Sequence, residues 1–204
     1  MNDDTAQTEE QEETDSENTD PEEEETTDEA TQEDEIQEKE QPQEIPVTLN
    51  LEQKKALTYA QELGYERSAQ VEQSITRADL AELLVLFLSQ EMDKKPDLSK
   101  ECVFTDSSRM STQVRAYTTI ACQYGLMGVG VDAFDPAAPV DRATFATVIS
   151  RALFGSMFDT HTSDRYTQHA RALKHIGVMN NIDSLFDTML QTDAMIVVER
   201  LYSS

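Results

Sequence analysis

The chain has 204 residues and a formal net charge of −25, but that charge is unevenly distributed. Residues 1–46 hold 21 acidic residues and one lysine, a net charge of −20, whereas residues 47–204 hold 20 acidic and 15 basic residues. Neither part has the clustered Lys and Arg that phosphate binding requires, so we expect no nucleic-acid partner. No apolar run approaches the ~18 residues that cross a bilayer, so we expect no membrane insertion.

Segment 1–46 consists largely of Glu, Asp, Thr and Gln, with almost no apolar residues. Because it cannot offset its ordering entropy by burial, its composition predicts a disordered, extended acidic linker. Residues 47–204 have the length and apolar content of one domain with a core. The chain starts with an acidic stretch, Met1 to Asp4, where a secretory signal would be basic and then apolar. We therefore expect either a cytoplasmic protein or one whose leader was removed before Met1.

Three predicted helices share a helical spacing of apolar residues and end at a glycine. Glycine adopts the left-handed conformation of a helix C-terminus without steric cost, so glycines at matching points indicate a repeated unit. The helices are predicted at 49–63, 114–124 and 166–176, followed by Gly64, Gly125 and Gly177.

A second helix is predicted after each of these glycines, and its start carries oxygen-bearing residues. Thr76 and Asp79 have the spacing of a capping box, Asp141 can cap the next helix, and Thr192 or Asp193 the last. The predicted helix bodies are Leu80–Leu88, Phe145–Phe154 and Met195–Tyr202. The first of them is apolar on nearly all sides, which predicts that these three helices lie together at the centre of the fold.

Arg77, Arg142 and Thr192, taken as equivalent positions, lie 65 and 50 residues apart, an interval typical of stacked repeats. The sequence therefore predicts an all-α fold of three helix-loop-helix units. Their approximate ranges are 47–95, 96–155 and 156–204.

Cys102 and Cys122 are the only cysteines, and they lack CxxC spacing. We interpret them as two small buried thiols, with a disulfide as the alternative for a protein outside the cell. The three histidines share no helix face at the spacing of a zinc site, and the sequence has no serine elbow or phosphate loop. We expect no catalytic residues, no bound metal and no cofactor.

The second unit resembles the S-layer homology family, whose modules anchor proteins to bacterial cell walls. Phe104-x-Asp106 resembles the F-x-D opening of that family, and Gly125-Leu126-Met127-Gly128 resembles its G-I-x-G turn. Residues 134–143 resemble its F-x-P-x-x-x-I-T-R-A stretch, which the first unit repeats at Ile75–Asp79. The third unit keeps the spacing, with Thr at position 192 where the family has Arg.

The resemblance implies a pseudo-threefold arrangement around a central three-helix bundle, with grooves that hold an anionic secondary cell-wall polysaccharide. An Arg in the first turn of a helix would add a bidentate donor to unpaired N–H groups and a partial positive charge. The structural alternative for each Arg is a surface ion pair that contributes under ~1 kcal/mol to stability. Asp106, likewise, is often a turn former. The candidate ligand-binding residues are Arg77, Asp79, Asp106, Gly128, Gly130 and Arg142.

Three functions remain open at this point. The first hypothesis is a non-catalytic cell-surface anchor, located in the cell wall or surface layer and held away from its cargo by the acidic linker. The second is a degenerate copy of the fold that acts in protein interaction or surface-layer assembly with other surface proteins. The third is a cytoplasmic helical protein with a coincidental repeat.

Overall fold

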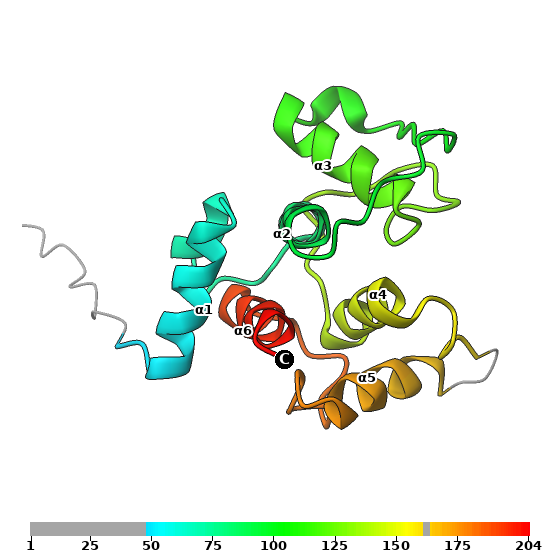
Figure 1. Ribbon diagram of the computed structural model, residues 1–204. Coiled ribbons are helices and arrows are strands. Elements are labelled where there is room, and N and C mark those ends of the chain that lie inside the picture. Colours follow the sequence, from blue (N-terminus) through cyan, green and yellow to red (C-terminus); the bar gives the residue numbers. More distant parts are fainter. Residues whose placement is uncertain (1–47, 161–163) are drawn as a thin grey trace, which may run out of the picture. The chain divides into compact units, whose positions relative to one another are not determined.

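The computed structural model describes residues 48–160 and 164–204, which belong to one unit, Pro46–Ser204. The predicted linker at 1–46 lies outside the described residues. Six α-helices and no strand form the described part, so the all-α prediction is confirmed (Figure 1). They are α1 (Leu51–Glu62), α2 (Arg77–Gln90), α3 (Thr112–Gln123), α4 (Arg142–Phe154), α5 (Arg165–His175) and α6 (Gln191–Tyr202), with short 3-10 helices at Glu66–Ala69 and Ser107–Arg109.

Helices α1, α3 and α5 end at glycines, as the sequence predicts. Gly64, Gly125 and Gly177 have φ angles of 82°, 77° and 80°. The Gly64 N–H donates to the Gln61 carbonyl at 3.0 Å, and the next N–H donates back into the last turn at 2.9 Å. The same pair of bonds recurs at the other two glycines. Each glycine therefore ends its helix and satisfies carbonyls that the helix leaves unpaired.

Side-chain caps begin α2 and α4, also as predicted. Thr76 and Asp79 form a reciprocal capping box, in which the Asp79 N–H donates to the Thr76 hydroxyl at 3.2 Å and the Thr76 N–H donates to the Asp79 carboxylate at 3.0 Å. The Asp141 carboxylate accepts from the Thr144 N–H at 2.6 Å. Both starts therefore satisfy helix donors that would otherwise lack a partner.

The start of α6 differs from the prediction. Leu190 occupies the cap position and makes no side-chain bond there. Thr192 donates its hydroxyl proton to the Val71 carbonyl, and Asp193 accepts a hydrogen bond from Arg142. The predicted cap from Thr192 or Asp193 is wrong, because both side chains bind other segments of the chain.

The helices pack in three pairs, α1 with α6, α2 with α3 and α4 with α5 (Figure 1). Each glycine-terminated helix thus packs on one of the other three. Helix α2 is buried along nearly its whole length, as its apolar sequence predicts, and a fully buried Leu or Phe side chain contributes about 1.5–3 kcal/mol. The largest fully buried side chains of α2, α4 and α6 include Leu80, Leu83, Leu84, Leu88, Phe145, Ile149 and Met195.

Backbone hydrogen bonds join the segments before α2, α4 and α6 into a closed ring. Ile75 donates to the Met189 carbonyl at 2.9 Å, Val140 donates to that of Ile75 at 3.0 Å, and Met189 donates to that of Val140 at 2.8 Å. Each segment therefore donates to one neighbour and accepts from the other. The three ring residues are buried, with exposures of 1% or less.

The ring fixes which residues of the three segments correspond. Two positions after each ring residue comes the first residue of a helix, namely Arg77, Arg142 and Gln191. The counterpart of the two arginines is therefore Gln191, and the choice of Thr192 was wrong by one residue. The spacing between matching residues is 65 and 49.

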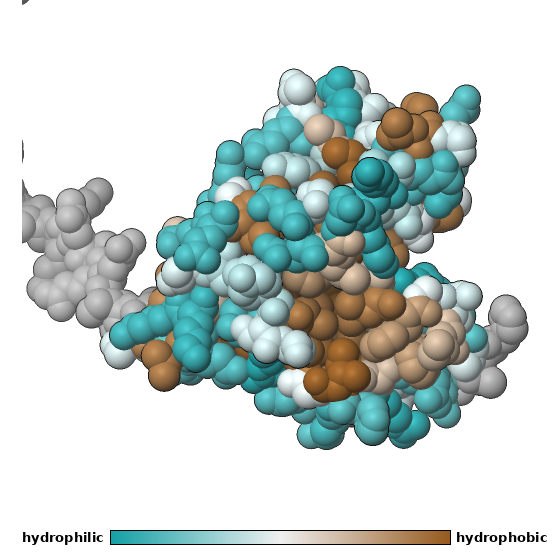
Figure 2. All heavy atoms as spheres, in the orientation of Figure 1, coloured by the Kyte–Doolittle hydropathy of each residue, from teal (hydrophilic) through white to brown (hydrophobic). Residues whose placement is uncertain are grey.

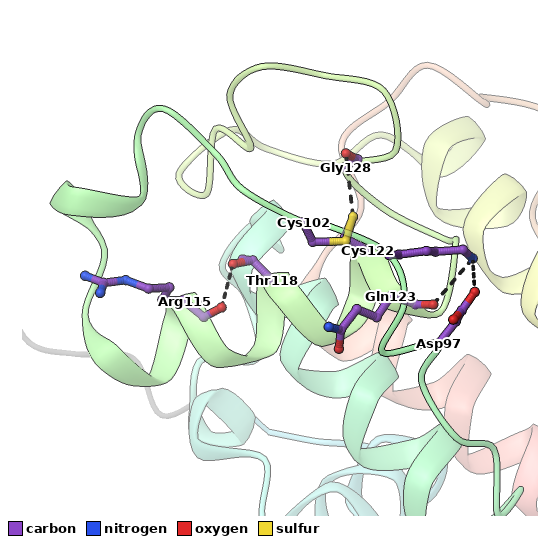
Figure 3. Close-up of a disulfide and its surroundings, with 8 residues drawn as sticks. Asp97, Cys102, Arg115, Thr118, Cys122, Gln123 and Gly128 are labelled. Atoms are coloured by element: carbon purple, nitrogen blue, oxygen red, sulfur yellow. Dashed lines mark hydrogen bonds and ion pairs between the residues drawn. A yellow bond between two sulfur atoms is a disulfide. The ribbon is translucent and has the colours of Figure 1, made fainter.

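Cys102 and Cys122 form a disulfide, with their Cα atoms 6.0 Å apart (Figure 3). The interpretation as two free thiols is therefore wrong, and the alternative of a disulfide is correct. The bridge joins α3 to the segment before it, across a sequence separation of 20 residues. The Gly128 carbonyl oxygen lies 3.9 Å from the sulfur of Cys122, so the bridge also contacts the loop after α3.

The surface seen in Figure 2 is mostly hydrophilic, with an apolar area over the region of α4 and α6. The longest described helix, α2, has 14 residues. Within the described ranges, none of the helices combines the length and the apolar character needed to cross a bilayer.

Candidate functional site

Arg77 binds the backbone and the ring of one residue, Phe134. Its Nε donates to the Phe134 carbonyl at 2.7 Å, and its guanidinium carbon lies 4.8 Å from the centroid of the ring. Burial lowers the pKa of Arg77, although the charges of Asp135 and Asp106 oppose this effect. Arg77 is thus a half-buried cation held in one orientation by an aromatic face and a carbonyl.

Asp106 fixes the same segment from the other side. One of its carboxylate oxygens accepts from the Phe134 N–H at 3.0 Å and the other from the Asp135 N–H at 2.8 Å. Burial alone would raise the pKa of Asp106, but these two backbone donors lower it below its usual value. The carboxylate therefore holds in place the distant segment that presents Phe134 to Arg77, a structural role, although not the local turn that the sequence suggested.

Gly128 packs against this cluster, whereas Gly130 does not. A Cβ atom on Gly128 would lie 2.7 Å from the Phe104 ring and 3.1 Å from that of Phe134, so only glycine fits. The same atom on Gly130 would meet nothing within 4 Å. Arg77, Asp106 and Gly128 thus meet at Phe134, and together these four residues form what we call the Arg77 junction. Gly130 lies outside it.

Arg142 forms a second junction with Asp193, Arg200 and Asn180. Its terminal nitrogen donates to the Asp193 carboxylate at 2.7 Å, while its Nε is buried without a hydrogen-bond partner. Arg200 binds Glu52 through Nε at 2.9 Å, and the Asn180 amide, with its oxygen toward Arg200, accepts from it at 3.0 and 3.2 Å. These residues line a hollow of about 170 Å³, which we call the Arg142 junction.

The third matching position is closed by a buried hydrogen-bond network, which we call the Gln191 junction. The Gln191 amide donates to Asp79 at 2.9 Å and accepts a hydrogen bond from the Tyr65 hydroxyl. All three side chains are buried, at exposures of 1–5%. Burial is the main cause that raises the pKa of Tyr65, with the charges of Asp79 and Glu82 adding to it. Asp79 therefore serves the fold here, with the Arg67 guanidinium 3.6 Å away as a further partner.

Two of the three junctions follow one geometric rule. In each of these two, the first residue of a helix bonds to the third residue of the next helix in the ring, Arg142 to Asp193 and Gln191 to Asp79. For Arg77 that third residue would be Thr144, which has no carboxylate. Arg77 consequently turns to the Phe134 carbonyl, and it is the arginine of the pair that lacks an internal carboxylate at this position.

The predicted receptor of unpaired N–H groups at the helix starts is absent from α2 and α4. The first two N–H groups of α2 donate to the carbonyls of Ala138 and Pro136, each at 2.9 Å, and the third donates to the Thr76 hydroxyl. The start of α4 is filled likewise by two backbone carbonyls and the Asp141 carboxylate. Any anion at these junctions must therefore be held by the arginine side chains, because the backbone donors are already used.

The structure contains a polar cluster between α4 and α5 that was not predicted from the sequence. His169 is 1% exposed; its Nδ1 lies 3.0 Å from the Ser150 hydroxyl oxygen and its Nε2 lies 3.1 Å from the Asp159 carboxylate. Arg151 donates to the same carboxylate at 2.9 Å, and this bond is the main cause that lowers the pKa of Asp159. Desolvation by burial lowers the pKa of His169 and outweighs the attraction of Asp159.

The order of these groups resembles a serine hydrolase triad, but the exposure does not suit one. Ser150 is fully buried within α4, so its hydroxyl cannot meet a substrate. A hollow of about 370 Å³ opens beside His169, lined also by Arg165 and Tyr166, away from the predicted arginines. One feature of the sequence could have indicated this cluster, namely the spacing of Thr147, Ser150 and Arg151 along one helix. That spacing does not identify the residues of other segments that these side chains contact.

Between residues 48 and 160 and from 164 onward, no group of three or more His, Cys, Asp or Glu side chains is arranged to hold a metal ion.

The six predicted ligand-binding residues do not form one site. They are divided among the Arg77 junction, the Arg142 junction and the Gln191 junction, and Gly130 lies outside all three. Comparison with known proteins finds no protein-family model that matches the chain and no curated protein that matches it.

Proposed function

We propose that the chain is a non-catalytic cell-surface anchoring module that binds an anionic secondary cell-wall polysaccharide. In this proposal three units of S-layer homology type surround a central bundle of α2, α4 and α6. The single observation that carries it is the closed ring of backbone bonds through Ile75, Val140 and Met189, because it puts Arg77 and Arg142 at matching positions. The motifs Ile75–Asp79 and Phe134–Ala143, which carry the family resemblance, contain two of the ring residues, Ile75 and Val140.

The disulfide supports an extracellular location. Disulfides persist in oxidising compartments and are rare where thioredoxin and glutathione keep thiols reduced. The Cys102–Cys122 bridge contacts Gly128, which packs on the Arg77 junction. A module of the cell wall or surface layer would keep this bridge, whereas a cytoplasmic helical protein would lose it.

The polymer would be held by guanidinium groups at two junctions. A guanidinium has five donors, of which Arg77 uses one on the Phe134 carbonyl, so donors remain for a carboxylate or phosphate. Arg142 would share its charge between Asp193 and the ligand in the hollow of about 170 Å³. The Gln191 junction would take no part, because its side chains are buried and neutral apart from Asp79.

Calorimetric titration of a purified anionic wall polysaccharide into the full chain tests the proposal. We expect binding that weakens with added salt, is reduced by Arg77→Ala and by Arg142→Ala, and is lost in the double variant. Arg77→Lys keeps the charge but loses the planar fork, so it should rescue only part of the affinity. The matched control is Arg171→Ala, an exposed arginine of α5 outside the three junctions. Unchanged affinity in the folded double variant would contradict the proposal.

A second function is favoured by the state of two junctions. The Arg142 charge is already paired by Asp193, and the Gln191 junction is closed. A degenerate fold that acts in protein interaction or surface-layer assembly would keep these internal contacts and need no polymer. Failure of the wild-type chain to bind any anionic wall polymer, with self-association or binding of surface proteins retained, would favour this alternative.

A further inference from the structure

A hollow of about 360 Å³ lies between α1 and α6, away from the three junctions. Two tyrosines form its floor, and charged side chains of both signs surround them. The residues that line it include Lys54, Lys55, Tyr59, Glu62, Glu199 and Tyr202. We call this feature the tyrosine hollow.

The two tyrosines are stacked, with ring centroids 4.7 Å apart and an interplanar angle of 21°. Tyr59 is 7% exposed and lies beneath Tyr202, which is 58% exposed. Tyr202 therefore offers solvent an aromatic face that is backed by a second ring. A backed ring is a rigid platform, because its partner restricts its side-chain rotation.

The hydroxyl group of Tyr59 is buried and has no hydrogen-bond partner. Burial is the main cause that raises the pKa of Tyr59, and the charge of Glu91 raises it further, followed by those of Tyr202, Glu199 and Glu62. Tyr59 is itself one of the residues that line the hollow. Buried hydroxyls nearly always have a partner, so an unpaired one beside a hollow points to a ligand that supplies it.

The charges around the tyrosine hollow select a neutral ligand. Lys54 and Lys55 are balanced by Glu62 and Glu199, so neither an anion nor a cation gains net attraction. An apolar partner would have to desolvate these charges without pairing them, which is costly. Sugar hydroxyls both donate and accept hydrogen bonds, and they suit a rim of ammonium and carboxylate groups.

We propose that the tyrosine hollow is a binding site for a neutral pyranose ring. The apolar face of the sugar stacks on Tyr202, a ring hydroxyl bonds to Tyr59, and further hydroxyls meet the charged rim. The site is separate from the arginine junctions and takes a neutral sugar, so it goes beyond the proposed binding of an anionic polymer.

Saturation-transfer NMR on the full chain, with cellobiose, maltose and N,N′-diacetylchitobiose as neutral probes, tests the site. We expect at least one of these disaccharides to bind at millimolar concentration. Tyr202→Ala should weaken its binding about tenfold, whereas Tyr202→Trp should keep it, since a larger ring stacks as well. The tryptophan would be unique in this chain, which has none, so its fluorescence gives an independent titration. The matched control is Phe186→Ala, which removes another exposed aromatic ring, 75% exposed.

Tyr59→Phe separates a ligand role from a purely structural one. It removes the unpaired hydroxyl and should therefore raise the thermal midpoint while weakening sugar binding severalfold. A raised midpoint with unchanged sugar affinity would overturn the role of Tyr59. Binding to none of the three disaccharides, or equal affinity in wild type and Tyr202→Ala, would overturn the site. The Arg77→Ala, Arg142→Ala double variant should bind the sugar normally, so failure here is distinguishable from failure of wall-polymer binding.

Discussion

The Arg77 junction and the Gln191 junction occupy matching places in the ring but are stabilised in different ways. At the first, a half-exposed cation rests on Phe134, whose segment is held by Asp106 and packed against Gly128. At the second, buried Gln191 bonds to two other buried side chains. Arg77 therefore keeps a charge available to solvent, whereas Gln191, at the matching position, is part of the buried core.

The difference shows where rigidity comes from when a side chain is left available for binding. The Gln191 junction is ordered by its own hydrogen bonds. The Arg77 junction is ordered by its surroundings, because the Cys102–Cys122 bridge contacts Gly128 (Figure 3). Gly128 in turn packs against Phe104 and Phe134. Breaking each support in turn should therefore have different consequences at the two places.

Removal of the disulfide should have the largest effect. In Cys102→Ala combined with Cys122→Ala, we expect the free energy of unfolding to fall by about 3 kcal/mol, the entropic value for a closed loop of this length. Urea titration measures the loss. Hydrogen exchange should rise more at the amides of Gly128 and Phe134 than at that of Gln191. The control is reductant, which should destabilise the wild type but not the double variant; equal exchange at both junctions would remove the proposed support.

The next largest effect should come from Asp79→Ala, compared with the matching change Asp193→Ala. Asp79 bonds to Thr76 and Gln191 in a buried setting, so its loss should cost about 2–3 kcal/mol through the lost cap and the unpaired amide. Asp193 forms a partly exposed ion pair with Arg142, so its loss should cost under about 1 kcal/mol. Chemical denaturation of both variants measures the difference. Similar losses would mean that Asp193 contributes as much to the free energy of unfolding as Asp79, and would contradict the expected difference between the two junctions.

The smallest effect should be a pH dependence at the His169 cluster, which is also held by buried polar contacts. The lowered pKa of His169 means that the fold favours the neutral ring. Its contribution to stability is therefore present above the unfolded-state pKa of about 6.5 and is lost as the pH falls below it. Urea midpoints between about pH 7.5 and pH 5 should fall less in His169→Gln than in the wild type. His175→Gln, at an exposed histidine, is the control and should titrate like the wild type.

Local chain chemistry made several features predictable from the sequence. Glycine at positions 64, 125 and 177 ends three helices because of its backbone freedom, which depends on no distant residue. The Thr76–Asp79 box is likewise a contact between residues three positions apart. Asp106 and Gly128 were selected through the family resemblance, but their contacts with the Phe134 segment next to Arg77 required the structure.

Features that depend on distant segments could not be predicted. From the sequence, Thr192 and Asp193 are both suitable as caps of α6, yet both lie inside the helix. Only the backbone pairing through Met189 shows that the helix starts at Gln191. The same pairing fills the helix starts with carbonyls from other loops, so no unpaired donors remain there for an anion. The disulfide and the contact of His169 with Asp159 join residues whose sequence spacing carries no signal.

The ring of bonds through Ile75, Val140 and Met189 has no first and no last member, since each residue both donates to and accepts from another. Helix α1 packs on α6, so the two ends of the helical unit are neighbours. Which of the three segments comes first in the chain is therefore of little consequence for the contacts that hold them. A circular permutant, joined between α6 and α1 and opened between α2 and α3, would retain every bond of the ring. The closed ring of hydrogen bonds thus defines the architecture, and the chain could begin at any of the three units.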